Sequence, residues 1–262
     1  GNKPDNQLYT EDDILTFDTL AAQTALAIEN CQFAQELADK ERLAAMGKFA
    51  ASIVHEVKNP LTAIKTFTEF LPQKYQDKSF IDKYSAVVSK EVDKMDGLAR
   101  ELLDFARPHP LELAETDIAQ LIDDALEMLS SDFLKHNVKV VKELCTLRLK
   151  VDPGRLKQAF LNLFLNAIDA MPSGGTLTIK THLCSSDKKF VTICVQDTGI
   201  GISKQDLPHL FEPFHSTKKG GTGLGLAVTY GIIKEHGGKI RVESKFNEGT
   251  AFIIELSLFN LA

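Results

Sequence analysis

The sequence predicts a helical part followed by an α+β part. The first is an antiparallel helical hairpin that forms a dimeric four-helix bundle, and the second is an α/β sandwich with a mixed, mostly antiparallel sheet. Apolar residues recur at helical spacing through most of residues 11–105. Two closely spaced prolines, Pro108 and Pro110, then mark a linker. From residue 113 onward helical and strand-like segments alternate, which is typical of a sheet covered by helices.

Composition limits the classes of protein to which the chain can belong. Its 262 residues suffice for two compact domains, and its net charge of −6 gives no reason to expect nucleic-acid binding. No apolar run approaches the roughly 18 residues of a membrane span, so no membrane contact is expected within this sequence. A reducing, cytoplasmic compartment fits four cysteines without metal-binding spacing: Cys31, Cys145, Cys184 and Cys194. Since the chain begins at Gly1, we interpret it as part of a longer protein, which leaves an upstream membrane anchor open.

Residues 11–70 are predicted to form a long helix in which Pro60 is the only proline. On one face of this helix, mainly apolar residues follow one another in alternating steps of four and three, with some polar residues among them. This is the heptad spacing of a parallel coiled coil. An amphipathic helix packed on its own domain is the alternative. The stretch from Tyr9 to Asn30 resembles the last helix of a GAF sensor domain. Residues 1–41 are therefore interpreted as the end of such a domain with a coiled-coil signalling helix.

A second amphipathic helix is predicted after a polar turn that follows Leu71–Pro72 and runs to about Lys78. Its apolar residues fall mainly on one face, and it stops at Arg107 before the linker. The short turn makes the two helices antiparallel neighbours, but a lone hairpin buries too little apolar surface to be stable. We therefore expect residues 42–110 to form a four-helix bundle in a homodimer.

The C-terminal part, residues 113–262, is predicted to contain three helices and a sheet. The helices occupy residues 118–129, 152–171 and 226–236, and the last ends at a Gly237–Gly238 C-cap. The strand-like segments are residues 138–144, 147–151, 176–183, 190–196, 239–244 and 250–257. A glycine-rich stretch from about Ser203 to Gly225 is too long for an ordinary turn, and loops of that length are usually functional.

His55 is the candidate reactive residue of the helical part. A neutral imidazole, with a pKa of about 6.5, is a competent nucleophile near pH 7, and Glu56 beside it can hold the other ring nitrogen. Pro60 removes a backbone donor, which predicts a kink just past the histidine. A lone helical histidine is more often a surface or core residue. A zinc-protease pattern is excluded because Asn59 stands where the second histidine is required.

Two asparagines are the first sign of a nucleotide site in the C-terminal part. Asn162 and Asn166 are spaced i, i+4 on the helix 152–171, so their amides project from one face. An amide oxygen is a suitable ligand for Mg²⁺, and an amide nitrogen can bond a phosphate oxygen. Ordinary polar cover of a helix is the alternative for this pair taken alone.

Two glycine-containing segments complete the predicted site. Asp197 follows a strand, where its carboxylate can accept from the exocyclic amine of adenine, and Gly199 and Gly201 let the backbone pass close to a flat base. The run Gly220-Gly221-Thr222-Gly223-Leu224-Gly225 leads into a helix and so presents backbone N–H groups to phosphate. It lacks the Lys-[Ser/Thr] of a Walker loop and the preceding strand of a Rossmann fingerprint.

The order and spacing of these segments resemble those of sensor histidine kinases over about residues 40–260. The matching segments are His55-Glu56…Asn59-Pro60, Asn162…Asn166-Ala167, Asp197…Gly199…Gly201, Phe211-Glu212-Pro213-Phe214 and Gly221-Thr222-Gly223-Leu224-Gly225-Leu226. The resemblance implies that residues 42–110 are a dimerisation and histidine phosphotransfer domain. It implies that residues 113–262 are a catalytic ATP-binding sandwich of the kind shared with gyrase, mismatch-repair and heat-shock chaperone ATPases.

The same resemblance implies roles for single residues of the sandwich. Asn166 would ligate Mg²⁺, Asn162 would support the phosphates, and Asp197 would accept from the adenine amine with Thr250 beside the base. The segment assigned to the phosphates comprises Gly221, Thr222, Gly223, Leu224 and Gly225, with its glycines as the lid and Lys218 as a γ-phosphate partner.

The helical hairpin carries a further match, and the position after Phe211-Glu212-Pro213-Phe214, which is the F box of this family, carries a departure. Glu56 and Asn59 match the element that positions water for dephosphorylating a partner. His215 departs from the family pattern, because an aromatic or polar residue is commoner there.

The function predicted from this resemblance is autophosphorylation of His55 with ATP and Mg²⁺, followed by transfer to an aspartate in the receiver domain of a separate response regulator. Phosphatase activity toward that regulator is a further expectation. An ATPase of the same sandwich family, driving a conformational change, is the alternative enzyme, but Asn162 stands where those relatives have a glutamate that activates water. A non-enzymatic dimeric scaffold is the alternative from another class, and the intact Asn166, Asp197 and lid glycines argue against it.

Overall fold

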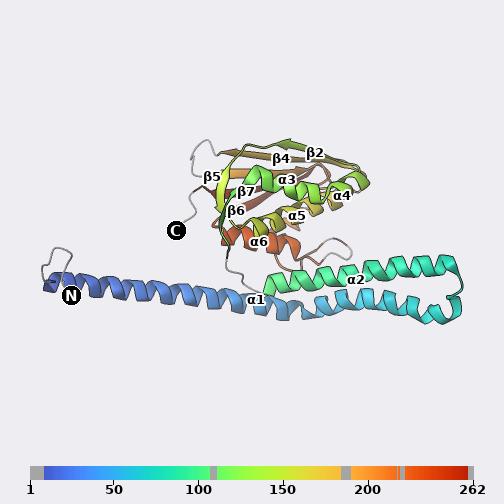
Figure 1. The fold of residues 1–262 in the computed structure, drawn as a ribbon, viewed down its shortest axis with the longest axis horizontal. Coiled ribbons are helices and arrows are strands. Elements are labelled where there is room, and N and C mark those ends of the chain that lie inside the picture. The colour runs from blue at the N-terminus through green and yellow to red at the C-terminus, as the bar shows by residue number, and fades with distance from the viewer. Residues whose placement is uncertain (1–8, 107–110, 184–189, 217, 219–221, 259–262) are drawn as a thin grey trace. The chain divides into compact units, whose positions relative to one another are not determined.

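The structure is a computed structural model, drawn in Figure 1, and it describes residues 9–106, 111–183, 190–216, 218 and 222–258. The chain divides into two units, residues 1–50 and residues 51–262. None of the helices in the described ranges is long and apolar enough to cross a membrane.

Helix α1, Glu11–Lys74, runs from the first unit into the second. Thr10 fixes its start: the backbone N–H and the hydroxyl of Thr10 donate to the carboxylate of Asp13 at 2.8 and 2.7 Å, and the N–H of Asp13 donates back to the hydroxyl at 3.3 Å. Several large apolar side chains of the first unit are exposed in a single chain: Ile14, Leu15, Phe17, Leu20, Leu26, Ile28, Phe33 and Leu37. The predicted coiled coil would cover them, and it stays a prediction.

The turn of the helical hairpin lies within the predicted segment, but the helix before it ends later than predicted. Helix α1 continues through Pro60 and Pro72 to Lys74, and only Tyr75–Asp77 separates it from α2, Lys78–Ala106. The predicted end of the first helix at residue 70 is therefore wrong, because a proline in the last turn removes only one backbone donor and leaves the preceding helix intact. Asp77 begins α2 by accepting from the N–H of Phe80 at 3.2 Å. The kink past His55 stays a prediction.

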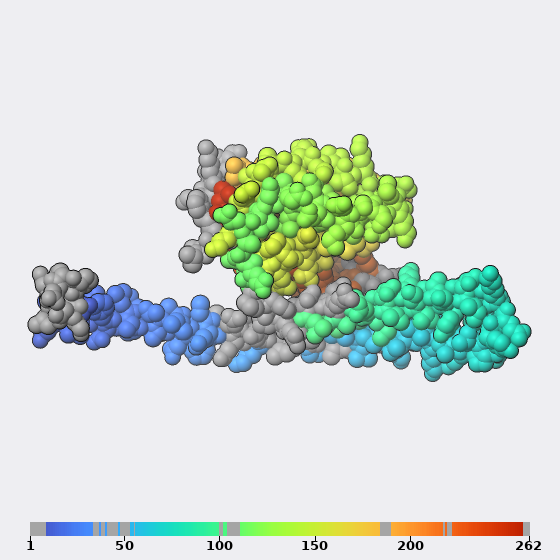
Figure 2. All heavy atoms as spheres, viewed as in Figure 1, coloured from blue at the N-terminus to red at the C-terminus, as the bar shows by residue number. Residues whose placement is uncertain are grey.

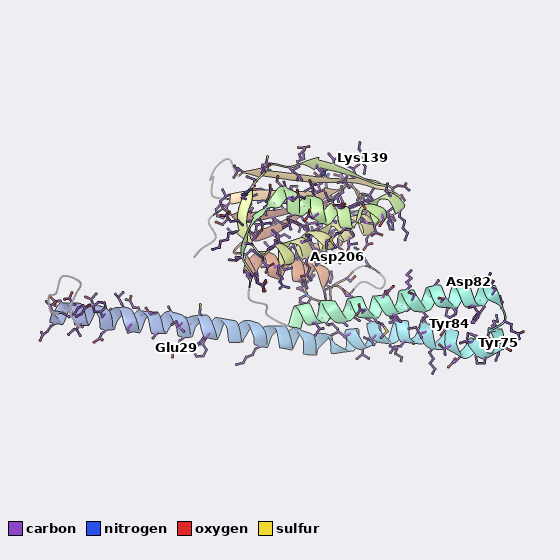
Figure 3. All side chains as sticks on the ribbon, in the orientation of Figure 1. Glu29, Tyr75, Asp82, Tyr84, Lys139 and Asp206 are labelled. Atoms are coloured by element: carbon purple, nitrogen blue, oxygen red, sulfur yellow. The ribbon has the colours of Figure 1, made fainter. Side chains whose placement is uncertain are left out.

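An aromatic cluster joins the two helices next to this turn. The ring centroids of Phe67 on α1 and Phe80 on α2 are 6.0 Å apart, and both rings lie about equally far from Tyr84, at 6.5 and 6.4 Å. Figure 3 labels Tyr84 on α2 and Tyr75 in the turn. Further along the hairpin, large apolar side chains remain exposed: Val54, Leu61, Phe70, Val92 and Leu103. A single copy thus leaves apolar surface uncovered, as the four-helix-bundle prediction requires.

The sandwich contains a five-stranded sheet in the order β2-β4-β5-β7-β6. Only the pair β2 and β4 is parallel, and the other three pairs are antiparallel. The strands are β2 (Val138–Glu143), β4 (Gly175–Leu183), β5 (Phe190–Asp197), β6 (Lys239–Lys245) and β7 (Gly249–Ser257). The predicted mixed, mostly antiparallel sheet is therefore confirmed. Lys139, labelled in Figure 3, lies on the edge strand β2, where a charged side chain discourages pairing with another sheet.

Helices cover one face of this sheet (Figure 1). Helices α5 (Pro153–Ala170) and α6 (Gly225–Glu235) contact strands of the sheet, and α3 (Ile118–Met128) packs against α5. The core between the layers contains fully buried side chains from both: Ile118, Ile122, Leu156, Phe160, Leu163, Phe164, Leu177, Ile179 and Ile193. Figure 2 shows the outer surface of this part. Because α5 contributes several of these fully buried side chains, it is a rigid support for its polar residues.

Two elements of the sandwich escaped prediction. Strand β1 (Ala114–Asp117) pairs antiparallel with β3 (Arg148–Val151) in a separate two-stranded sheet, and α4 (Ser130–Lys135) follows α3 directly. The β1 residues Ala-Glu-Thr-Asp show no apolar alternation, because pairing with β3 rather than side-chain burial makes them extended. The predicted strand at 147–151 is thus confirmed, but it lies outside the main sheet.

Candidate nucleotide-binding site

Asn162 connects the helix α5 to the start of α6. Its side-chain Nδ2 donates to the carbonyl oxygen of Gly225 at 3.0 Å and lies 3.5 Å from the hydroxyl of Thr229. The same carbonyl accepts from the Thr229 hydroxyl at 2.8 Å. Asn162 therefore holds the first residue of α6 against α5, and its own oxygen is the amide atom left for a ligand.

Asn166, one turn further along α5, contacts a lysine from the glycine-rich stretch. The Nζ of Lys218 donates to Oδ1 of Asn166 and to Oδ2 of Asp169, each at 2.9 Å. Asn166 is half-buried, whereas Lys218 and Asp169 are exposed. Sequence reasoning missed Asp169, although its i+3 spacing from Asn166 puts it on the same face of the helix.

Asp197 ends β5 and is buried, with 4% of its surface exposed. Its Oδ1 accepts from the backbone N–H groups of Gly199 at 2.8 Å and Thr250 at 3.3 Å. Burial raises the pKa of this carboxyl above its usual range, against the lowering effect of those two N–H groups and of the Lys218 charge. None of the residues that the structure describes donates to Oδ2, so this oxygen is open to a ligand with a donor.

The turn after Asp197 is fixed from two sides. The N–H of Ile200 donates to the carbonyl of Ala170 at the end of α5 at 3.0 Å, and the carbonyl of Ile200 accepts from the N–H of Asn247 at 2.7 Å. Gly201 has φ +67°, and a Cβ at this position would lie 2.1 Å from the carbonyl oxygen of Lys245. Only glycine fits such a close approach, so the backbone of this turn is held rigidly beside Asp197.

Ser244 and Thr250 lie next to this turn, and the sequence predicted only Thr250 as part of the site. The Ser244 hydroxyl accepts from the N–H of Ile202 at 2.8 Å and lies 2.9 Å from the hydroxyl of Thr250. Thr250 is buried opposite Asp197 in the β5–β7 register, and its position beside the base stays a prediction. Ser244 carried no signal of its own in the sequence, because only the pairing of β6 with β7 brings it to Thr250.

The segment before α6 is only partly described. Gly221 lies outside the described residues. The hydroxyl of Thr222 accepts from the N–H of Leu224 at 3.3 Å, and the carbonyl of Gly223 accepts from the N–H of Phe214 at 3.0 Å. The Leu224 side chain is completely buried, so it anchors the segment in the core and is not available to a ligand.

Gly225 is not crowded by its protein neighbours. A Cβ at this position would lie 3.7 Å from the nearest other atom, Cγ of Asn162, which is ordinary contact distance. The protein itself therefore does not require glycine here. Gly225 lines a cavity at the N-terminus of an eleven-residue helix, and such a terminus is suited to a phosphate group.

His215, at the end of the F-box segment, lies beside Asp206, with 3.6 Å between its Nε2 and Oδ1 of the aspartate. Figure 3 labels Asp206 on the segment between β5 and α6. Phe211 packs against Tyr230 of α6 with ring centroids 5.3 Å apart. The F-box segment therefore keeps an aromatic contact to α6, although the residue that follows it is a histidine.

Most of these residues line one cavity. Its polar lining from the sandwich includes most of the predicted residues: Asn162, Asn166, Asp197, Gly201, Lys218, Thr222, Gly223, Gly225 and Thr250. Amide oxygens, an exposed carboxylate at Asp169 and a helix N-terminus fit a magnesium-bound polyphosphate, and the open oxygen of Asp197 fits an exocyclic amine.

The predicted catalytic residues lie on α1. Glu56 is half-buried and Asn59 is exposed, one turn from His55 along the helix. The backbone of His55 is helical, and its side chain lies outside the described side chains.

This sheet, the asparagine helix and the glycine loop before α6 together define an ATP-binding sandwich. A family model described as "Histidine kinase-, DNA gyrase B-, and HSP90-like ATPase" matches residues 151–260, and a model described as "His Kinase A (phospho-acceptor) domain" matches residues 45–110. The chain belongs to the sensor histidine kinase family. The resemblance inferred from the sequence is thereby confirmed.

Individual relatives agree with this assignment. The sensor histidine kinase ZraS of Klebsiella oxytoca is 34% identical over 229 residues, which are 86% of this chain and 49% of the relative. Sporulation kinase E of Bacillus subtilis (strain 168) is 35% identical over 230 residues, 87% of this chain and 31% of the relative. The chain spans about half the length, or less, of these curated relatives.

Solved structures are similar as well. The histidine kinase ThkA in complex with the response regulator protein TrrA matches with a TM-score of 0.75 and 28% identity, over 87% of this chain and 66% of that chain. The catalytic domain of ThkA alone matches with a TM-score of 0.51 and 33% identity, over 56% of this chain and 96% of that chain.

Proposed function

We propose that the chain uses ATP to phosphorylate its own His55 and then passes the phosphoryl group to an aspartate of a response regulator. The observation that carries this proposal is the meeting of Asn166, the open oxygen of Asp197 and the N-terminus of α6 at Gly225 on the lining of one cavity. The presence of a phospho-acceptor domain in the same chain supplies the group that would receive the phosphoryl group.

Nucleotide recognition is assigned to Asp197 and to the N-terminus of α6, which both line the cavity. Oδ2 of Asp197 accepts from the exocyclic amine of adenine, while Oδ1 stays bonded to the N–H groups of Gly199 and Thr250. Guanine carries a carbonyl at that position, so its oxygen would face a carboxylate and be rejected. The N-terminus of α6 at Gly225 receives the phosphates.

Magnesium is assigned to Asn166, with Asp169 next to it. Both supply the oxygen ligands that this ion prefers, directly or through bound water. When bound, the ion supplies charge neutralisation between the phosphate oxygens. Asn162 does not join this set through its nitrogen, because Nδ2 is held by the carbonyl of Gly225.

The transfer step needs a neutral imidazole at His55. One ring nitrogen forms a bond to the γ-phosphorus as the bond to the β,γ-bridging oxygen breaks, and ADP leaves with that electron pair. Glu56 accepts a hydrogen bond from the other ring nitrogen and stabilises the positive charge that develops there. Asn59, one turn on, is assigned to positioning water for dephosphorylating the regulator.

The proposed partners are a second copy of this chain and a response regulator. The exposed apolar side chains of the hairpin support the first, and the ThkA–TrrA complex, in which a related kinase holds a response regulator, supports the second. The alternative ATPase is disfavoured because Asn162 offers no carboxylate to activate water, and its amide is engaged with Gly225.

The direct test is incubation of the full chain with γ-labelled ATP and Mg²⁺. We expect label that is stable to alkali and labile to acid, present in the parent and in His136→Gln, and absent in His55→Gln. His136 lies in the sandwich between α4 and β2, so it controls for the loss of any histidine. Label that survives His55→Gln, or steady phosphate release unaffected by it, would contradict the proposal and favour the ATPase.

A further inference from the structure

Lys218 places its positive charge where a metal ion could bind. Its Nζ lies 2.9 Å from both Oδ1 of Asn166 and Oδ2 of Asp169. An amide oxygen and a carboxylate oxygen are also ligands for a divalent ion. The two oxygens that suit a magnesium site are therefore occupied by an ammonium group of the chain itself.

We propose that Lys218 and Asp169 form a cation-exchange pair: Lys218 occupies the cation subsite at Asn166 in the free protein and leaves it when a magnesium nucleotide binds. This inference rests on the proposed nucleotide site and assigns to it a role for Asp169 that the sequence did not indicate. Asp169 acts as a positioning residue, because it attracts either cation to Asn166.

The exchange follows from the distances. A magnesium ion requires its oxygen ligands at about 2.0–2.1 Å and in near-octahedral positions. The ammonium group of Lys218 already donates to Asn166 Oδ1 at 2.9 Å. Both cations cannot use that oxygen together, since two positive charges a few ångströms apart repel each other strongly outside bulk water.

The released lysine needs a new anionic partner. The nearest new negative charge is the polyphosphate, and ATP carries one more phosphoryl group than ADP. The positive charge of Lys218 is therefore better neutralised in the ATP complex than in the ADP complex. In the ADP complex, Lys218 competes with the metal ion for Asn166 and Asp169. The pair should thus favour ATP over ADP and set the magnesium concentration that nucleotide binding requires.

The effect is expected to be moderate because the pair is solvent-exposed, with side-chain exposure of 41% for Lys218 and 59% for Asp169. Exposed pairs contribute little, which corresponds to changes in binding of about two- to fivefold. For the same reason neither Lys218→Met nor Asp169→Asn should alter the fold, and an unchanged thermal midpoint verifies this.

The test is calorimetric titration of ADP and ATP at a series of magnesium concentrations, using the full chain with His55→Gln so that no phosphoryl transfer occurs. In Lys218→Met we expect half-maximal ADP binding at about two- to fivefold less magnesium, and a similar fall in the preference for ATP. Asp169→Asn should act oppositely and require more magnesium, since the subsite loses its negative charge. Lys218→Arg should stay close to the parent.

Lys204→Met is the matched control, because Lys204 is another exposed lysine of the same stretch between β5 and α6. An unchanged magnesium requirement in Lys218→Met, or an equal change in Lys204→Met, would overturn the exchange and leave the proposed function intact. Failure of the parent to bind either nucleotide would instead overturn the proposed function itself.

Discussion

The backbone N–H of Asp152 donates to Nε2 of His236 at 2.9 Å, which joins the start of α5 to the end of α6. The other ring nitrogen of His236, Nδ1, donates to the carbonyl of Ile232 at 2.8 Å, and the imidazole is 3% exposed. The carboxylate of Asp152 caps α5 at Arg155 and also accepts from the N–H of Glu112 at 3.0 Å. One buried imidazole thus fixes the two helices that carry Asn162 and Gly225.

Removing this imidazole should destabilise the sandwich. We expect His236→Ala to lower the free energy of unfolding by about 2 to 4 kcal/mol, because it leaves the Asp152 N–H without an acceptor and opens a cavity. His136→Ala is the control: His136 makes the same bond from Nδ1 to the carbonyl four residues back, at 2.9 Å from Asp132, but it is only half-buried. Urea unfolding of the full chain followed by circular dichroism measures both, and equal losses would contradict the role given to Asp152.

Asp197 should reduce stability at neutral pH while it serves adenine recognition. Burial raises the pKa of Asp197 in the folded chain. The protonated carboxyl therefore contributes to the free energy of unfolding below the ordinary pKa of 3.8, and this contribution is lost as the pH rises through the folded pKa. Asp197→Asn keeps an acceptor for Gly199 and Thr250 but carries no charge. We therefore expect its thermal midpoint, relative to the parent, to rise between acidic and neutral pH, while ATP binding weakens at least about tenfold.

Asp152→Asn should show the opposite dependence of stability on pH. Burial alone would raise the pKa of Asp152, but backbone N–H groups of Arg155, Glu112 and Gly154 outweigh it and the pKa is lowered. A lowered pKa contributes stability above 3.8 that disappears as the pH falls through the folded pKa. Asp152→Asn should therefore cost stability at pH 7 and cost little in acid. Parallel pH profiles for the two variants would contradict this assignment.

The parts of the site that were predictable depend on short-range geometry. The i, i+4 spacing of Asn162 and Asn166 fixes their common face once the helix is identified, and the helix is long and strongly patterned. Asp197 could be placed at a strand end because an apolar run stops there. The C-cap at Gly237 also followed locally, and the structure gives it φ +68°.

The parts that escaped prediction depend on contacts between distant segments. Lys218 meets Asp169 across 49 positions of the chain, and His236 meets Asp152 across 84. No periodicity marks such pairs, because each side chain reads locally as an ordinary surface or helix-end residue. Strand β1 is a similar case, since its extended form comes from pairing Ala114 with Val151.

Asn162 should act by positioning Gly225. In Asn162→Ala the Gly225 carbonyl loses one of its two side-chain donors and α6 is held less firmly, so we expect ATP to bind about five- to tenfold more weakly. Asn162→Asp should weaken binding further, because a carboxylate would face that carbonyl at 3.0 Å without a donor. Thr229→Val removes the other side-chain donor and should resemble the alanine variant. Phosphate release that increases in Asn162→Asp would instead indicate a hidden ATPase site.

Two glycine variants should separate space needed by the protein from space needed by the nucleotide. Gly225→Ala meets only ordinary contacts, at 3.7 Å from Asn162, and adds a methyl group to the first turn of α6. We expect the free energy of unfolding to rise by about 0.4 to 1 kcal/mol, because alanine restricts the unfolded chain more than glycine does. ATP binding should nevertheless fall at least about tenfold, since the methyl group would lie against Asn162, where both residues line the cavity assigned to the phosphates.

Gly201→Ala should give the reverse pattern in stability. Its Cβ would lie 2.1 Å from the Lys245 carbonyl at φ +67°, so the turn beside Asp197 must shift or strain, and we expect a loss of more than about 1 kcal/mol. Thermal unfolding with and without ATP distinguishes the two variants. Without ATP, the thermal midpoint should be higher than that of the parent in Gly225→Ala and lower in Gly201→Ala. In Gly225→Ala, ATP should no longer raise the midpoint. If Gly225→Ala still gained stability from ATP as the parent does, the phosphates would have to lie elsewhere than at the start of α6.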